Sequence, residues 1–199
     1  MDTPLFHGEL VRLAAPNPEA DAEALSRWQR DAEFLRLLDS DAARPLPVAQ
    51  NKTDMEAIVA RESSFAFMIR TLADDRVIGF IGLGRPQWTH GDAWLGIGLG
   101  DREYWGKGCG TDALRVMLRF AFTELNLHRV SLGVFEYNPR AVRSYEKAGF
   151  VLEGRTRQDV RRDGRYWDSL WMGILREEWE RQNPKSQDSR MGILKEETT

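Results

Sequence analysis

A glycine-rich stretch stands directly before the longest amphipathic pattern of the chain. It reads Tyr104-Trp105-Gly106-Lys107-Gly108-Cys109-Gly110-Thr111, with glycine at every second position from 106 to 110. Glycine permits left-handed and crowded backbone conformations, so successive N–H groups can turn toward one anion. A helix that follows adds its unpaired first-turn N–H groups and the positive end of its dipole. The spacing therefore predicts a phosphate-binding loop, and the alternative is a glycine turn without a ligand.

Two better-known glycine motifs do not fit this stretch. A P-loop requires G-x-x-x-x-G-K-[ST], whereas Lys107 is followed here by Gly108. A dinucleotide-binding fingerprint requires G-x-G-x-x-G after a strand, whereas the three glycines are spaced G-x-G-x-G. Neither motif accounts for the stretch.

The composition is that of one globular domain. The chain has 199 residues, of which 42% are hydrophobic and 30% are charged. A net charge of -3 gives no general attraction to nucleic acid or anionic membranes, so any polyanion must be held by a local site. The N-terminus shows no signal pattern, and no apolar run approaches the roughly 18 residues of a membrane span. We therefore expect a cytoplasmic protein.

Metal and disulfide chemistry are not indicated. The one cysteine, Cys109, excludes an internal disulfide framework. The three histidines, His7, His90 and His128, are scattered along the chain and form no metal-ligand spacing. We therefore expect no metal cofactor.

The first part of the chain is predicted to form one strand and then helices. Residues 8–13 form a short strand, and the turn residues and prolines of 16–18 then start a helix that runs to about Trp28. Asn51 or Thr53 is predicted to cap a further short helix. We expect these helices to cover one edge of a sheet.

The sequence period then changes to that of strands. Residues 65–69 and 77–83 predict a hairpin, and 93–99 predicts a third strand. Glycine weakens a strand unless something comes close to the backbone, so Gly96 and Gly98 predict a bulge or a close approach beside a binding site.

The second half predicts strand–helix units and a second hairpin. The expected elements are a helix over 111–125, a strand over 129–135, a helix over 138–149 and strands over 150–160 and 166–175 around Arg162-Asp163-Gly164. The order predicts an α/β or α+β domain with a mixed sheet over 1–182. Residues 183–199 form a polar tail, and 191–197 nearly repeat 172–178. The repeat is a chance similarity, or it imitates the last strand and docks on a sheet edge.

Two segments in order resemble the acetyl-CoA-binding motifs of the GNAT N-acetyltransferases. They are 104–114 and 138–150, and a predicted strand separates them as in that family. The later segments 153–155, 162–168 and 178–179 resemble the branch that contains the ribosomal-protein N-terminal acetyltransferases. The resemblance implies a bent, mostly antiparallel mixed sheet of about seven strands flanked by helices.

The resemblance also implies how acetyl-CoA binds as co-substrate. The fourth and fifth strands, 93–99 and 129–135, would splay apart and hold pantetheine between them like an extra strand. The loop from 106 to 111 would hold the pyrophosphate, with Lys107 either near it or solvated. Asn138 would bond the pantetheine arm or only cap a helix. The implied cofactor-binding residues are Leu99, Trp105, Gly106, Lys107, Gly108, Cys109, Gly110, Thr111 and Asn138.

The reaction implied by the resemblance needs a proton donor for the leaving group. An unprotonated amine attacks the thioester carbonyl, and CoA departs as a thiolate that benefits from a proton. Tyr145, seven residues after Asn138, matches the family tyrosine that protonates this sulfur. Its alternative role is that of a core tyrosine. Cys109 belongs to the pyrophosphate loop, far from the acetyl group, so we expect it to pack rather than to form an acetyl-enzyme.

The general base does not carry over from the family. Many relatives have a glutamate in the pattern Ala-Glu-x-Gly, and this chain has Ala93-Trp94-Leu95-Gly96. Asp92, Glu136 and His90 are candidate substitutes, directly or through water, although each is also typical of a solvated loop. A substrate amine of low pKa, such as an α-amino group, would need no dedicated base.

The sequence thus predicts an N-acetyltransferase that acts on a primary amine, either a protein N-terminal α-amine or a small-molecule amine. The alternative is an acyl-CoA-binding module with little or no catalysis, suggested by Trp94 and by further tryptophans at 88, 105 and 167. No basic run indicates a nucleic-acid partner. Dimerisation through the late strands is common in the family, so a homodimer is one expected assembly.

Overall fold

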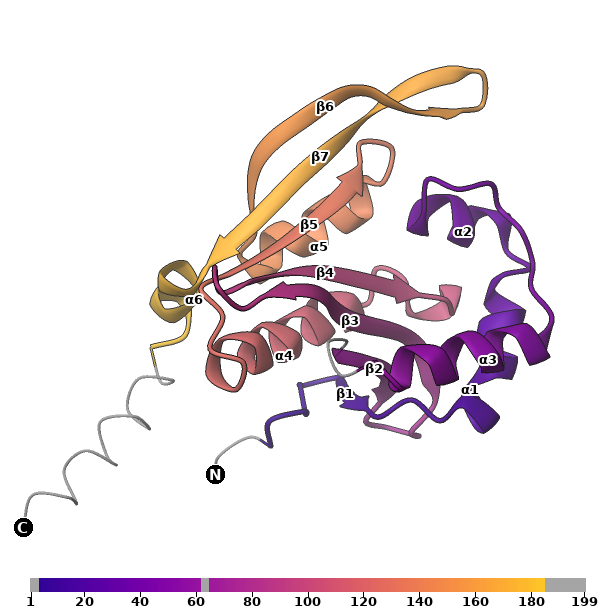
Figure 1. Cartoon of the computed structure of the whole chain (residues 1–199), viewed down its shortest axis with the longest axis horizontal. Coiled ribbons are helices and arrows are strands. Elements are labelled where there is room, and N and C mark those ends of the chain that lie inside the picture. Colours follow the sequence, from indigo (N-terminus) through magenta and orange to yellow (C-terminus); the bar gives the residue numbers. More distant parts are fainter. Residues whose placement is uncertain (1–3, 62–64, 185–199) are drawn as a thin grey trace, which may run out of the picture.

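A twisted sheet is the frame of the molecule (Figure 1). The structure is a computed structural model that describes residues 4–61 and 65–184. In these ranges seven strands follow the spatial order β1-β2-β3-β4-β5-β7-β6. Their bounds are β1 (Val11–Ala14), β2 (Phe65–Thr71), β3 (Val77–Gln87), β4 (Asp92–Leu99), β5 (Arg129–Phe135), β6 (Val151–Arg162) and β7 (Arg165–Leu175). β4 and β5 run parallel and the other neighbours run antiparallel, which confirms the predicted mixed, mostly antiparallel sheet.

Helices cover both faces of the sheet (Figure 1). They are α1 (Pro18–Trp28), α2 (Ala32–Leu38), α3 (Val48–Val59), α4 (Cys109–Thr123), α5 (Pro139–Ala148) and α6 (Arg176–Gln182), with a 3-10 turn at Arg102–Tyr104. The first three share a core with Met68 and Phe80 on one face. The buried stripe of α4, including Leu114 and Met117, packs with Leu83 and Leu95 on the other. None of the helices in the described ranges is long and apolar enough to cross a membrane.

The helix starts confirm one sequence prediction and correct another. Asn17 caps α1, because its side chain accepts hydrogen bonds from two backbone N–H groups of the first turn. Neither Asn51 nor Thr53 caps α3, which begins at Val48 after Pro47. Asn51 is buried inside this helix, where it exchanges two 2.9 Å hydrogen bonds with Gln29. Gln29, which directly follows α1, thus satisfies the side-chain amide of Asn51, which the local sequence had suggested as a helix cap.

The predicted bulge at Gly96 and Gly98 is wrong. Both residues pair in regular register with β3, and the bulge lies in β3 itself, between Gly84 and Gln87. The predicted close approach to the backbone is found at Gly98, where an added Cβ would lie 2.8 Å from the ring of Phe80. An added Cβ at Gly96 would meet nothing within 4 Å. This glycine therefore exposes bare backbone and does not bend the strand.

The end of the chain follows the predictions in part. Asp163 and Gly164 both have positive φ, as expected for the tight turn between β6 and β7. The helix α6 was not predicted, and its Trp179 packs against Phe122 with ring centroids 5.4 Å apart. Apart from its first two residues, the predicted tail 183–199 with its near-repeat lies outside the described residues.

A buried carboxylate ties the first turn of α4 to the N-terminal strand. Asp112 is 6% exposed and accepts backbone hydrogen bonds of 2.8–3.1 Å from Glu9, Leu10 and Val11. Gly8 leaves room for this contact, because an added Cβ would lie 2.3 Å from an Asp112 carboxylate oxygen. The contact fixes where α4 begins.

We expect Asp112→Ala to destabilise the protein strongly. Three buried N–H donors would lose a charged acceptor, at a cost on the order of 2–4 kcal/mol. For a chain of this size the midpoint of thermal unfolding should fall by roughly 5–15 °C. Asp54→Ala is the matched control, because its exposed carboxylate accepts a hydrogen bond from Gln50 of the same helix. Equal unfolding midpoints for the two variants, measured by circular dichroism, would contradict the assignment.

Candidate functional site

The two parallel strands part soon after they meet. β4 and β5 pair over three residues, from Asp92 opposite Arg129 to Trp94 opposite Ser131, and β4 then continues to Leu99 paired with β3 alone. A cleft of about 930 Å³ lies along this gap and is lined by both strands and by the starts of α4 and α5. Backbone groups on the facing edges lack strand partners, so an extended ligand with its own amides would satisfy them.

The glycine stretch lies where the cleft meets α4. Gly106 and Gly108 take the left-handed φ values of 73° and 89°, and Gly108 immediately precedes the 15-residue helix. An added Cβ at Gly106 would meet nothing within 4 Å, so the backbone there faces open space. The hydroxyls of Thr111 and Ser144 lie 2.8 Å apart and join α4 to α5. First-turn N–H groups and positive-φ glycines together form a cradle suited to a phosphate.

The structure brings most of the sequence-predicted cofactor residues to the cleft. The lining includes Leu99, Trp105, Gly106, Gly108, Gly110, Thr111 and Asn138. The Trp105 indole donates a 2.7 Å hydrogen bond to the Leu99 carbonyl, which holds the loop on the end of β4. Lys107 and Cys109 are not among the lining residues.

Those two residues have other surroundings. Lys107 is exposed, with its ammonium 5.9 Å from the centre of the Tyr104 ring. Cys109 is buried in the core, and this burial raises the pKa of its thiol. A buried thiol of raised pKa is a poor nucleophile.

A basic stripe on α5 was missed in the sequence. Arg140, Arg143 and Lys147 all line the cleft, at spacings of three and four residues that place them on one helix face. The Arg140 guanidinium lies 3.8 Å from the centre of the Trp105 ring, and burial lowers its pKa. The stripe adds positive charge beside the cradle. Its spacing was the signal that could have revealed it.

Tyr145 and Asn138 present polar groups to the same cleft. Tyr145 is 7% exposed, and burial raises its pKa to about 12. In the described part of the chain its hydroxyl has no hydrogen-bond partner, while its ring packs against Phe150. Asn138 caps α5 through its Oδ1, which accepts from the Ala141 N–H at 3.2 Å. The cap leaves the Asn138 Nδ2 free to donate into the cleft.

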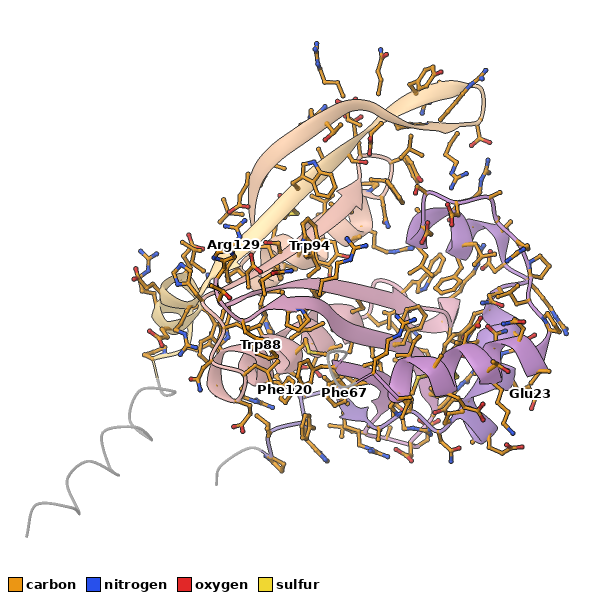
Figure 2. The ribbon with its side chains drawn as sticks, viewed as in Figure 1. Glu23, Phe67, Trp88, Trp94, Phe120 and Arg129 are labelled. Carbon is orange, nitrogen blue, oxygen red and sulfur yellow. The ribbon has the colours of Figure 1, made fainter. Side chains whose placement is uncertain are left out.

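The candidate bases are not among the lining residues. Asp92, Glu136 and His90 are all absent from the cleft wall. The Glu136 carboxylate lies 3.0 Å from the Arg155 guanidinium and also accepts from the Asp168 N–H at 3.4 Å. Trp94, which Figure 2 labels, lies at the family position of the base. Its ring packs edge to face with that of Trp171, with centroids 5.6 Å apart. No cluster of three or more metal-ligating side chains occurs within residues 4–61 and 65–184.

The comparisons with known proteins agree with this geometry. A family model described as an acetyltransferase (GNAT) domain matches residues 11–151. The probable N-acetyltransferase YjcK of Bacillus subtilis (strain 168) is 36% identical over 128 residues, which are 62% of this chain and 68% of that protein. YokL, an uncharacterized N-acetyltransferase from the SPbeta prophage of the same strain, is 30% identical over 179 residues, 87% of this chain and 94% of YokL.

A solved structure extends the likeness to the whole fold. The spermidine N-acetyltransferase of Vibrio cholerae, in complex with CoA and spermine, matches with a TM-score of 0.76 at 25% identity. The match covers 85% of this chain and 97% of that one. Because the family model spans more than half of the chain and YokL is similar along nearly all of it, the chain belongs to the GNAT acetyltransferase family and is by that membership an acetyl-CoA-dependent acyltransferase.

Proposed function

We propose that this protein transfers the acetyl group of acetyl-CoA to a primary amine by direct attack of the amine on the thioester. The observation that carries the proposal is the cleft between β4 and β5, which has a glycine cradle at one end and the Tyr145 hydroxyl in its wall. These features match the two ends of one ligand, a pyrophosphate and a leaving sulfur. The amide-bearing pantetheine arm would lie between them.

Each part of the cofactor has residues suited to hold it. The N–H groups from Gly106 to Thr111 would bind the pyrophosphate, and Arg140, Arg143 and Lys147 would neutralise further phosphate charge. The unpaired edges of β4 and β5 would bond the pantetheine amides, with the Asn138 Nδ2 as an additional donor. Lys107 is exposed, and a contribution of its charge to binding the pyrophosphate stays a prediction.

Tyr145 would hold the proton that the departing sulfur needs. Its burial disfavours the phenolate, so the hydroxyl is protonated at the pH where an amine is nucleophilic. In the described residues no protein group competes for this proton. In this proposal the chain keeps a protonated donor in the wall of the cleft.

The same arrangement favours catalysis over simple binding. A module that only holds acyl-CoA needs the cradle and the strand edges, and it has no use for an unpaired hydroxyl in a buried wall. Calorimetry with acetyl-CoA, followed by CoA release over a panel of amines, separates the two functions. Binding without release on any amine would leave the binding module as the function.

The panel of amines also tests a finer prediction about the acceptor. The segments 153–155, 162–168 and 178–179 favour the branch of ribosomal-protein N-terminal acetyltransferases, so a peptide α-amine belongs in the panel beside small amines. The homodimer and the cytoplasmic location also stay predictions. Size-exclusion chromatography with light scattering tests the first of these.

Replacing Tyr145 by Phe should remove the proton donor without disturbing the cofactor site. We expect kcat to fall by on the order of 10²–10⁴, since this is the usual contribution of a general acid. The KM for acetyl-CoA should stay unchanged, because the substitution leaves the glycine cradle and the strand edges intact. Tyr166→Phe at the exposed hairpin turn is the matched control. A Tyr145→Phe enzyme with the wild-type kcat would exclude the role.

The pH–rate profile should follow the amine of the substrate. The acid limb reports deprotonation of the amine, and Tyr145 keeps its proton up to about pH 10, because that pH is well below its raised pKa. Activity should therefore rise to a plateau with no alkaline fall in this range. Asp92→Asn and Glu136→Gln should leave the acid limb in place. An additional ionisation that disappears in either variant would identify that carboxylate as the base.

Cys109→Ala should retain full turnover. The thiol is buried and its pKa is raised by burial, so it has no role as a nucleophile. We expect kcat within about twofold of wild type and a stability loss of about 1 kcal/mol from the small cavity. Mass spectrometry of a quenched reaction should show no acetylated enzyme. An acetyl group on Cys109 would contradict direct transfer.

A further inference from the structure

The cleft continues beyond the cofactor residues onto the face of the sheet that α1–α3 cover. Its lining there includes Leu25, Leu38, Met55, Ile58 and Phe80. This region lies past the strand edges that suit pantetheine, so it is the place where an acceptor amine would lie. An apolar body is what these side chains would bury.

Glycines form the floor of this region. Gly82 of β3 pairs with Gly96 of β4, and Gly84 pairs with Trp94. Added Cβ atoms at Gly84 and Gly96 would meet nothing within 4 Å. The two strands thus offer bare backbone to the cleft, and Trp94 forms a wall beside it. A flat or slender apolar group fits such a floor.

One arginine borders this floor with no partner. Arg85 lines the cleft and is exposed, and in the described part of the chain its side chain has neither an ion pair nor a hydrogen bond. It lies in the β3 bulge with φ of 53°, a left-handed conformation that is uncommon for a long side chain. Strained backbone of this kind persists where the surrounding structure holds it, often at binding sites.

The cofactor does not account for this charge. Arg85 directly follows Gly84, the partner of Trp94, whereas the phosphate cradle follows Leu99. Five residues of extended strand separate Trp94 from Leu99, which is roughly 16 Å. The phosphates belong to the far end of β4, so Arg85 is available to another anion.

The charge of the whole lining has one sign. Its charged members are Arg85, Arg140, Arg143 and Lys147, and the described lining contains no aspartate, glutamate or histidine. Arg140, Arg143 and Lys147 are assigned to the phosphates of the cofactor, so Arg85 is the charged lining residue left for the acceptor. It disfavours a polyamine, which carries several positive charges. An acceptor with one amine and one carboxylate meets a complementary surface.

A strap of polar contacts joins α2 to the β6–β7 hairpin. The Arg162 guanidinium of the β6–β7 hairpin donates to the carbonyls of Asp39, Ser40 and Asp41, which follow α2, at 2.7–2.9 Å. Arg36 of α2 forms an ion pair with Asp163 in the hairpin turn. The hairpin belongs to the β5 side of the sheet, through β7, and α2 contacts β4. The strap therefore holds α2, whose Leu37 and Leu38 line the cleft, over this region, and the cover favours a small acceptor over a folded protein.

Resting on the proposed acetyl transfer, we infer that the acceptor is a small primary amine with an apolar body and a carboxylate that Arg85 binds. Arg85 is then a specificity residue that touches the acceptor and takes no part in cofactor binding. Bidentate pairing with a carboxylate is the geometry for which a guanidinium is suited.

A matched acceptor series tests the inference. Phenylalanine, its amide and 2-phenylethylamine share one body and differ in the carboxylate, and spermidine with a short peptide completes the series. CoA release by the full chain is measured, and kcat/KM is expressed per unprotonated amine. We expect phenylalanine to exceed its amide by about 10- to 100-fold and spermidine to be poorer than both.

Substitutions at Arg85 then test whether this side chain causes the preference for a carboxylate. Arg85→Gln should abolish the advantage of the acid while leaving kcat/KM for the amide and the KM for acetyl-CoA unchanged, and Arg85→Lys should keep part of it. Arg27→Gln, at an exposed arginine of α1 outside the lining, is the control. The inference is overturned if wild type prefers spermidine, the peptide or the amide, or if Arg85→Gln lowers all acceptors equally. Failure of every amine to release CoA would instead count against the proposed transfer itself.

Discussion

The parting of β4 and β5 is the constraint on which the rest of the site depends. Parallel strands that separate after three paired residues leave backbone donors and acceptors without partners inside the molecule. The fold tolerates this because each strand is fully paired on its other side, with β3 and with β7. The gap is thus held open by the sheet around it and does not collapse. A ligand with regularly spaced amides can complete the ladder, and that requirement selects an extended, amide-bearing cofactor arm.

The residues proposed to bind the cofactor are positioned by contacts outside the gap. Asp112 anchors the first turn of α4 to the N-terminal strand, so the phosphate cradle is fixed by a contact some hundred residues away in sequence. The Trp105 indole holds the loop on Leu99, and the pair of Thr111 and Ser144 joins the first turn of α4 to the middle of α5. The strap between α2 and the β6–β7 hairpin acts on the opposite side of the cleft. Two independent sets of contacts therefore bound the cleft in which we propose that cofactor and acceptor meet.

Much of this could be predicted from local patterns, and the misses have physical causes. Strand periods, the helix start at residues 16–18 and the turn at Asp163-Gly164 depend on neighbouring residues and were predicted correctly. The start of α3 was wrong because Gln29, distant in sequence, satisfies Asn51 inside the helix. The bulge was assigned to β4 and lies in β3. A pattern of glycines shows that space is needed near the backbone, but it does not show which of two paired strands bends. Arg85 was missed for the same reason, because only the bulge in β3 brings it to the cleft.

The two groups of glycines show why residue type alone could not define the site. Gly106 and Gly108 are required for their positive φ, which turns N–H groups toward an anion. Gly84 and Gly96 lie in extended strands of ordinary geometry, and what matters there is the absent side chain, which leaves the acceptor floor bare. Glycine thus permits an unusual backbone conformation beyond one end of β4 and leaves space for a ligand near the other end. The cradle follows the end of β4 and the floor lies near its start. In the proposed binding mode this order sets the direction of the cofactor along the strand and puts the reacting amine on the side of Trp94.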